Sequence, residues 1–402
     1  MNVNFGAARA RVKSLAAAVA LVVVAAVALA PAAAPASERR SPRSLTAAVS
    51  AAIYDRAGVT AAAAAAEGRD ARVRVDRRSG DRTWAFGVAV LTAPHVEGAY
   101  PDGWLFVARR DGRSWDVGLE GSATFRSLAA MAPRTVVLAH ERAGFTRAGV
   151  KPQVIASGNT RLRLPYALDQ TWAMPGGPHG WAGSDTPYSS IDLAGGDQIV
   201  RAAGSGSAYL MCRGWIRIAH STGYTTDYYH LWDNISPASG SAISEGAYVG
   251  YTGTDITCGG AASARHVHFS LLADGARTSL YQKSFGKWVF WPTTPYNGYA
   301  THGSTVRYPG GGLYNYGRLG ANQGIVDSNG GTSINKRSGP GTGYPVVGSV
   351  ADGATITISC WRNGTSHAGR YGTTSVWDKL TDGTWVSDAF VYTGTYTIGP
   401  QC

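Results

Sequence analysis

The chain has 402 residues, 44% of them hydrophobic and 16% charged, which is enough apolar material for a globular protein of two or three units. The net charge of +11 lies mostly in the first 160 residues, because residues 161–402 carry 16 Lys and Arg against 14 Asp and Glu. No helix-turn-helix, RNP or zinc-finger pattern accompanies the basic excess, so the composition argues against a nucleic-acid-binding protein.

The first forty residues have the pattern of a secretory signal peptide. A basic stretch ending at Lys13 precedes an apolar run from Leu15 to Ala30, and small residues around 34–37 suit signal peptidase. The alternative is a single membrane anchor, but the apolar run is short for a bilayer and is followed at once by Pro31. We therefore expect a signal peptide over 1–37 and a secreted, extracellular protein without stable membrane anchoring.

Residues 38–160 are predicted to form an α+β pro-region. The Ala-rich span 45–67 suits one or two helices, and strand-like runs between Thr83 and Val117 are separated by Gly and Asp turns. The span contains no cysteine and no cluster of potential ligands. We expect it to assist folding or to block the site; a retained accessory domain is the alternative.

The second half of the chain is predicted to be mainly β. It is rich in Gly, Ser, Thr, Tyr and Trp, and short runs such as DQIVRAA, GWIRIAH and HVHFSLL are separated by Gly or Asp turns. A loop-like stretch from Thr301 to Gly331 predicts a boundary, and the short strands beyond it predict a small β-barrel. The expected units are an antiparallel β-sheet domain over 161–312 and a barrel over 325–402.

Four cysteines, an even number in a chain with a predicted signal peptide, favour disulfides. They are Cys212, Cys258, Cys360 and Cys402, and sequence proximity suggests pairing the first with the second and the third with the fourth. A zinc site made of all four is the competing interpretation, but no C-x-x-C spacing supports it.

The segment His266-Val267-His268 is the first candidate for chemistry. Side chains alternate between the two faces of a β-strand, so both imidazoles point the same way while Val267 and Phe269 face the core. A pair of histidines on an apolar strand also occurs at surface or core positions without any function. The rest of the sequence must decide between these interpretations.

Two further segments supply matching residues. A Gly-rich loop contains His179 and Asp192, and the segment TTDYYHL places His230 at the end of another strand. Neutral histidines and one carboxylate are the ligands that Zn²⁺ prefers in a catalytic site with one position open to water. A zinc peptidase also needs a general base, but there is no H-E-x-x-H motif and Glu245 is the only glutamate after residue 160. Histidines left over from coordination are the natural candidates for that role.

Over roughly 162–300 the chain resembles the LasA and β-lytic branch of the M23 peptidoglycan endopeptidases. The segments that carry the resemblance are LRLPYALDQTWAMPGGPHG, YSSIDLA, GWIRIAHSTGYTTDYYHL and RHVHFSLLADGARTSL. The resemblance implies a zinc metalloendopeptidase with one Zn²⁺ per chain, held by His179, Asp192 and His268. It also implies that His230 and His266 are the catalytic histidines and that Cys212 pairs with Cys258.

The match to this branch has one supporting feature and two departures. His179 and Asp192 are thirteen residues apart, as in the LasA branch, whereas most M23 peptidases space these residues four apart. The branch has a catalytic tyrosine after the H-x-H strand, and Tyr296 corresponds to it only with a one-residue gap. Much of the wider family has a proline just before H-x-H, where this chain has Ala264 and Arg265.

The C-terminal segment resembles a bacterial SH3-type wall-binding domain, on the strength of SINKRSGPGTGYPVVGSV and VWDKLTDGTWVSDAFV. Exposed aromatic side chains would suit the binding of peptide stems or sugars. Several of Trp361, Trp377, Trp385 and Tyr371 must instead belong to the core.

These observations together predict a monomeric bacteriolytic enzyme whose partners are peptidoglycan peptides and which binds no nucleic acid. The expected reaction is hydrolysis of Gly-containing peptide bonds in peptidoglycan cross-bridges. One alternative is a general extracellular protease for Gly-rich proteins. The other is a catalytically inactive wall-binding protein that keeps the fold.

Overall fold

The structure is a computed structural model that describes residues 44–146 and 158–402. The predicted signal peptide over 1–37 and much of the C-terminal end of the predicted pro-region lie outside the described residues. Within the described parts of the chain, no helix is long and apolar enough to cross a membrane.

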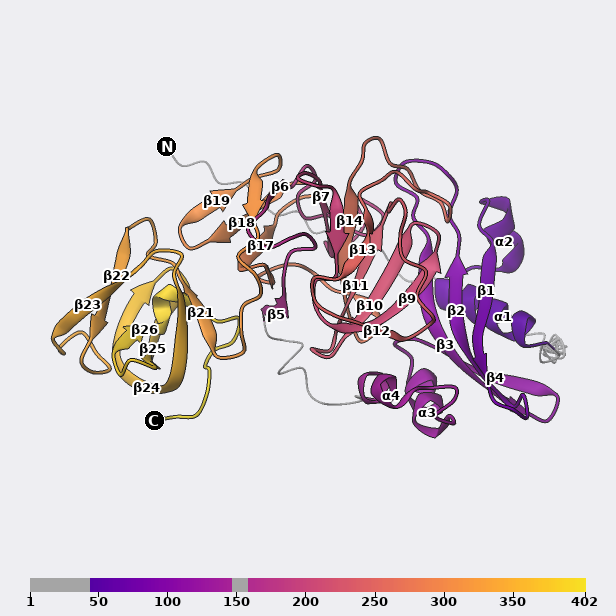
Figure 1. Ribbon diagram of the computed structural model, residues 1–402, viewed down its shortest axis with the longest axis horizontal. Helices are drawn as coiled ribbons and strands as arrows, with labels where there is room; N and C mark the ends of the chain where they lie inside the picture. Colours follow the sequence, from indigo (N-terminus) through magenta and orange to yellow (C-terminus); the bar gives the residue numbers. More distant parts are fainter. Residues whose placement is uncertain (1–43, 147–157) are drawn as a thin grey trace, which may run out of the picture. The chain divides into compact units, whose positions relative to one another are not determined.

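Residues 44–146 form an antiparallel sheet in the order β1-β2-β3-β4, with helices beside it (Figure 1). The first helix begins after Ser44, whose hydroxyl accepts a hydrogen bond from the amide of Ala47, and it ends at Gly58, which has a φ of 68°. The helices and strands that the sequence predicts over 45–67 and 83–117 are confirmed. The elements are α1 (Leu45–Ala57), α2 (Ala61–Ala66), β1 (Ala71–Arg78), β2 (Trp84–Leu91), β3 (Asp102–Asp111), β4 (Ser114–Leu119), α3 (Ala123–Met131) and α4 (Ala139–Phe145).

Both faces of β2 and β3 are buried. On one face Ala85, Ala89 and Phe106 pack with apolar residues of α1. On the other face Phe86 and Val107 belong to a core that also contains residues of α3 and of the sheet that follows in the chain. This double burial explains the continuous apolar run WAFGVAVL in β2, since a strand with one solvated face would alternate.

The first of two seven-stranded sheets in the second half, here called the large sheet, has the order β12-β9-β10-β11-β14-β15 with β7 paired to β14, and its pairings are antiparallel (Figure 1). Its strands are β7 (Ser190–Leu193), β9 (Gly206–Cys212), β10 (Trp215–His220), β11 (Tyr224–Tyr229), β12 (Ser241–Ile243), β14 (Val267–Ala273) and β15 (Ala276–Arg277). Alternate side chains, among them Ile216, Tyr228, Val267 and Phe269, form the core under one face. The side chains between them, including His268, lie on the opposite face.

Smaller sheets complete this part of the chain. One has the order β19-β18-β17-β16-β5, and two pairs join β20 to β6 and β13 to β8. The strands are β5 (Asn159–Leu162), β6 (Thr171–Ala173), β8 (Ile199–Arg201), β13 (Tyr248–Tyr251), β16 (Ser284–Phe285), β17 (Trp288–Pro292), β18 (Gly298–His302), β19 (Thr305–Arg307) and β20 (Gly312–Tyr314).

The prediction that the chain is loop-like from Thr301 to Gly331 is wrong. This span contains the end of β18, all of β19 and β20, and β21 (Gln323–Val326). These strands are short and Gly-rich, and β20 finds its partner β6 about 140 residues earlier in the chain. A local pattern of turn residues cannot reveal a strand that is stabilised by such a distant pairing.

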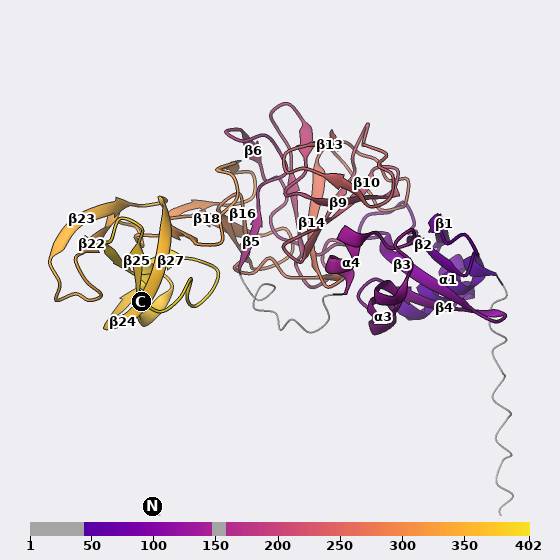
Figure 2. The same cartoon turned by 60° about the horizontal axis from the view of Figure 1, so that its bottom comes forward.

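The C-terminal residues form a sheet in the order β23-β22-β26-β25-β24-β21-β27. Figure 2 shows this part of the chain, with β22, β23, β24, β25 and β27 labelled. Its other elements are β22 (Ser333–Arg337), β23 (Val346–Ala351), β24 (Thr355–Gly369), β25 (Gly372–Leu380), β26 (Trp385–Ser387), the 3₁₀ turn η1 (Asp388–Phe390) and β27 (Val391–Tyr392). Trp377 and Trp385 are buried, whereas Trp361 and Tyr371 are partly exposed. The prediction of strands in this segment is confirmed, although β24 and β25, with 15 and 9 residues, are longer than the short strands expected. The chain is mainly β with largely antiparallel sheets, as expected.

Two disulfides cross-link the second half of the chain. Cys212 pairs with Cys258, and Cys360 pairs with Cys402. The pairing predicted from sequence proximity is confirmed. Each bond closes a loop of more than forty residues, which reduces the conformational freedom of the unfolded chain.

Candidate active site

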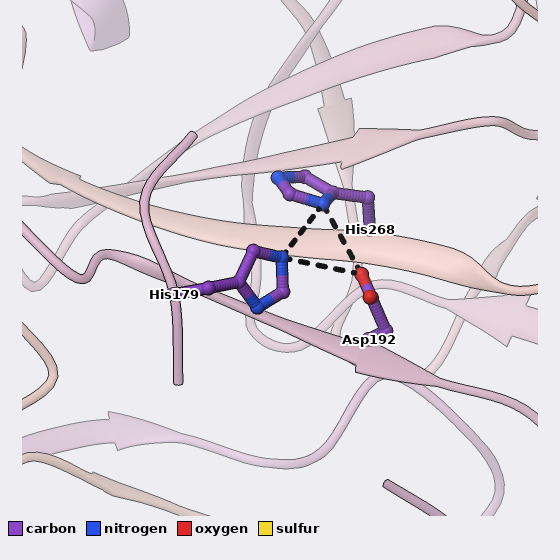
Figure 3. Close-up of side chains that lie close together, drawn as sticks. All are labelled: His179, Asp192 and His268. Carbon is purple, nitrogen blue, oxygen red and sulfur yellow. Dashed lines mark hydrogen bonds and ion pairs between the residues drawn. The ribbon is translucent and has the colours of Figure 1, made fainter. Parts of the chain in front are cut away.

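Three side chains from separate segments converge on one point of the large sheet (Figure 3). His268 on β14 and Asp192 on β7 occupy facing positions of neighbouring strands, and His179 lies in the loop before β7. The distance from His179 Nε2 to His268 Nδ1 is 3.3 Å, and Asp192 Oδ1 lies 3.1 Å from His268 Nδ1 and 3.5 Å from His179 Nε2. Both histidines are fully buried, and the aspartate side chain is 15% exposed.

The triangle of donor atoms has the dimensions of one face of a tetrahedral zinc site. Bonds of about 2.0–2.1 Å in tetrahedral geometry separate neighbouring ligand atoms by about 3.3 Å. His179 Nδ1 lies 2.6 Å from the carbonyl oxygen of Gly177, so this nitrogen carries the proton and Nε2 offers a lone pair. The residues present therefore fit a bound Zn²⁺.

The absence of a side chain at Gly176 lets the loop that precedes β7 approach Asp192 closely. A Cβ atom at Gly176 would lie 2.4 Å from Asp192 Oδ2, closer than two such atoms can approach. The amide of Asp192 donates to the carbonyl oxygen of Gly176, which fixes this approach. The glycine at position 176 is therefore a steric requirement of the site.

Two further imidazoles stand beside the triangle. His230 directly follows β11 and has a φ of 67°, and His266 directly precedes β14. Each donates its Nδ1 proton to a backbone carbonyl, His230 to Asp255 at 2.9 Å and His266 to Ala264 at 2.8 Å. Their Nε2 atoms therefore carry lone pairs, and that of His266 lies 3.6 Å from Asp192 Oδ1. The centroids of the His230 and His266 rings are 4.8 Å apart.

Burial sets the charge state of these groups. It lowers the pKa of His268 to about 4 and, together with the neighbouring imidazoles, lowers the pKa of His230 to about 3. Burial acts in the opposite sense on Asp192, but the nearby histidines hold the pKa of its carboxyl group well below its usual value. Near neutral pH His268 and His230 are thus neutral and Asp192 is a carboxylate, and a divalent cation requires a neutral imidazole or a carboxylate of its ligands.

Tyr296 also lies at this cluster. Its ring stacks on that of His179 with centroids 4.2 Å apart and an angle of 19° between the planes. Its amide donates to the carbonyl oxygen of Pro178, and its side chain is 43% exposed. The structure thus brings together every residue that the sequence analysis singled out for the site.

A residue that the sequence analysis missed reaches the same point from the N-terminal part of the chain. The hydroxyl of Tyr100 lies 3.2 Å from His230 Nε2, and its ring centroid lies 5.1 Å from that of His268. The ring also packs edge-on against Trp181 and Tyr229. Its surrounding sequence, AYPDGW, is typical of a turn, so no local pattern could indicate this position.

The chain segment around Tyr100 is fixed by backbone hydrogen bonds. The amide of Ala93 donates to the carbonyl oxygen of Cys258, and that of Gly260 donates to the carbonyl oxygen of Pro94. The indole of Trp181 donates to the carbonyl oxygen of Pro101 at 2.7 Å. These bonds hold the segment that places Tyr100 beside His230.

Sequence comparison places the chain among known proteins, although no family model matches it. It is 34% identical to protease LasA of Pseudomonas aeruginosa over 143 residues, which are 33% of this chain and 34% of LasA. It therefore spans only about a third of the length of that curated relative. It is 30% identical to beta-lytic metalloendopeptidase of Lysobacter enzymogenes over 132 residues, which are 30% of this chain and 73% of that relative.

A solved structure is also similar. The M23 metalloprotease pseudoalterin from the deep sea shares 27% identity, and the match covers 38% of this chain and 97% of pseudoalterin with a TM-score of 0.36. The family assignment rests on the sequence relatives, since the match covers most of the beta-lytic enzyme at 30% identity. The chain belongs to the M23 metallopeptidase family, in the branch of LasA and beta-lytic metalloendopeptidase.

Proposed function

We propose that this chain is a secreted zinc metalloendopeptidase that hydrolyses Gly-containing peptide bonds in peptidoglycan cross-bridges and so lyses bacteria. The observation that carries the proposal is the convergence of His179, Asp192 and His268, whose donor atoms lie within 3.5 Å of one another. The imidazoles of His230 and His266, each with an unprotonated Nε2, lie beside them. This combination supplies a cation site and proton-transfer groups in one place.

His179, Asp192 and His268 would hold one Zn²⁺ per chain. When bound, the ion polarises the carbonyl group under attack and makes water a better nucleophile. Two neutral imidazoles and a single carboxylate leave the ion with a net positive charge, which strengthens both effects. The hydrogen bond from His179 to Gly177 keeps the ligand nitrogen unprotonated.

His230 and His266 take the place of the glutamate base that this part of the chain lacks. Both Nε2 atoms are unprotonated and lie next to the cluster, so one imidazole accepts a proton from the attacking water and donates it to the leaving amine. The other steadies the charge that develops on the carbonyl oxygen. Burial raises the pKa of Tyr296 to about 12, so its phenol stays neutral and can donate a hydrogen bond to the same oxygen.

The preference for glycine follows from the walls of the site. Backbone of the Gly-rich loop forms one side, where a Cβ at Gly183 would lie 2.9 Å from the hydroxyl of Tyr296. This close approach of the loop to Tyr296 leaves little room beside them, which would favour residues with small side chains in the substrate. The name of the beta-lytic relative also agrees with a lytic metalloendopeptidase activity.

The chain would be made as a precursor. The proposed units are a signal peptide over 1–37, a pro-region over 38–160, a peptidase domain over 161–312 and an SH3-type wall-binding domain over 325–402. Support for a blocking role of the pro-region comes from Tyr100, whose hydroxyl lies 3.2 Å from Nε2 of His230, the nitrogen that we assign to proton transfer. The mature enzyme would act as a monomer on peptidoglycan peptides.

The test is digestion of defined peptidoglycan by the full chain after cleavage between residues 147 and 157. Mass spectrometry of the soluble products should show new ends at glycine in walls with glycine cross-bridges. Walls with directly linked stems are the control and should stay intact. Equal cleavage of a soluble Gly-rich protein would favour a general protease. A metal-loaded chain that releases nothing from either substrate would exclude peptidase activity.

A further inference from the structure

The sheet face that bears the metal-binding residues continues into a polar row. On β14 this row begins two residues after His268. Its five residues lie on five neighbouring strands, and each is paired with the next across the sheet. They are Ser190, Ser270, Asp227, Arg217 and Tyr209. Because side chains two residues apart share a face, this row lies on the same side as His268 and lines the same surface.

Two arginines in this row share a single carboxylate. Arg217 makes a two-pronged contact with Asp227, with both N–O distances at 2.8 Å, and Arg277 lies 2.8 Å from the same carboxylate. The side chains of Arg217 and Asp227 are at most 1% exposed, and that of Arg277 is 17% exposed. Burial lowers the pKa of Arg277 to about 10, so it remains charged near neutral pH. The three groups therefore carry a net charge of +1 in a buried position.

The N-terminal region supplies the missing negative charge. Arg217 Nη1 donates to Glu120 Oε2 at 2.6 Å and to the carbonyl oxygen of Gly103 at 3.0 Å. The side chain of Glu120 is 8% exposed. A buried guanidinium without a counter-charge is costly, so departure of the N-terminal region would leave a position with high affinity for a carboxylate.

We propose that Arg217 and Arg277 form a carboxylate-binding subsite of the peptidase, which Glu120 fills in the precursor and an acidic residue of the peptide substrate fills in the mature enzyme. This inference rests on the proposed function and adds a requirement for a negative charge near the cleaved bond. In the precursor, the carboxylate of Glu120 thus takes the place of the substrate carboxylate.

The subsite lies close to the metal-binding residues. Ser270 accepts a hydrogen bond from Arg277 at 3.0 Å and lies two residues from His268, about 7 Å along an extended strand. Arg277 also stacks on Trp181 at 3.6 Å, and that ring lies 5.0 Å from the ring of His268. The Arg277 side of the subsite is therefore within reach of an acidic residue about two positions from the cleaved bond.

The experiment compares two Gly-rich peptides that differ only in one residue, glutamate or glutamine, two positions from the scissile glycine. The full chain is cut between residues 147 and 157, and the N-terminal part is removed. Binding is then followed by intrinsic tryptophan fluorescence, and cleavage is followed by mass spectrometry. The mature enzyme should bind and cleave the glutamate peptide about tenfold better or more, as expected for a hydrogen bond to a charged group. The uncut precursor should show no such preference, because Glu120 occupies the position.

Arg277→Gln should bring the ratio between the two peptides close to one, and Arg277→Lys should keep part of it. Arg213→Gln is the matched control, since this arginine pairs with Asp255 and its side chain is 77% exposed. It should leave the ratio unchanged. Equal binding of both peptides to the mature enzyme would overturn the inference even if both are cut. Tighter binding of the glutamate peptide without any cleavage would support the subsite and contradict the proposed function.

Discussion

The hydroxyl of Tyr100 lies 3.2 Å from Nε2 of His230, a residue 130 positions later in the chain. Because Nδ1 of this histidine donates its proton to the carbonyl of Asp255, the phenol must be the donor in the contact. Burial raises the pKa of Tyr100, so the phenol remains neutral and keeps its proton. The lone pair that we assign to proton transfer is therefore occupied in the full chain.

Replacing Tyr100 by alanine should activate the precursor. The substitution removes one hydrogen bond and the aromatic contacts with Trp181 and Tyr229, so the uncut chain should gain roughly tenfold or more in peptidase activity. Tyr100→Phe keeps the ring and should give a smaller gain. The measurement is the rate of peptide cleavage by uncut protein, with its integrity checked by gel. An alanine variant no more active than the wild type would contradict the blocking role.

Replacing His266 by alanine should separate catalysis from metal binding. Its Nε2 lies 3.6 Å from Asp192, outside the triangle of donor atoms, so the variant should keep its zinc. Loss of a proton-transfer group should lower kcat by roughly 10²- to 10⁴-fold. Metal analysis and kinetics on the same preparation make the test. Loss of zinc in parallel with activity would instead make His266 a ligand.

Replacing Gly176 by alanine should weaken metal binding. The added Cβ would lie 2.4 Å from Asp192 Oδ2 and must displace the carboxylate. Disturbing the groups that orient a ligand typically costs about 10- to 100-fold in affinity. Gly343→Ala is the matched control, because nothing lies within 4 Å of its added Cβ. Competition with a zinc chelator measures both variants, and equal affinities would refute the steric role of Gly176.

The buried carboxyl pair of the C-terminal sheet should make the protein less stable as pH rises. Burial raises the pKa of Asp378 to about 7, and burial with the nearby Asp378 raises the pKa of Asp388 to about 8. An unfolded chain has an aspartate pKa of about 3.9, so the folded protein binds more protons between about pH 4 and pH 8. Stability is fully present below this window and is lost as pH rises through it.

Asp378→Asn should flatten this pH dependence, because a neutral amide needs no proton in the folded state. We expect its Tm to exceed that of the wild type at about pH 9 and to change less between about pH 6 and pH 9. Asp382→Asn serves as the control, because that side chain is nearly half exposed and pairs with Lys336. Thermal unfolding of the full chain across this range is the measurement. A variant that follows the wild-type decline would show that the pair is not its cause.

The sequence alone predicts the arrangement of side chains where a local pattern determines it. Alternation along β14 places His266 and His268 on one side of the strand and Val267 in the core, which the structure bears out. The gathering of His179, Asp192 and His268 followed from the family resemblance, because no local pattern links residues that far apart. Their assignment as zinc ligands stays a prediction.

Two features could not be predicted from the sequence, and the physical reason is the same for both. Tyr100 reaches His230 because β2 and β3 pack on the large sheet through a shared apolar core, and that packing depends on contacts between distant residues. The pairing of Arg217 with Glu120 arises in the same way, across 97 positions of the chain. Surface complementarity of this kind leaves no periodic pattern in either segment.

The central claim is that three distant side chains bind one catalytic zinc ion, and the metal content of the purified full chain tests it most directly. We expect about one zinc per wild-type chain, as a three-ligand catalytic site requires. His268→Ala should contain no tightly bound zinc and, after removal of the pro-region, should have no peptidase activity. A His268→Ala variant that retains both zinc and full activity would contradict the claim.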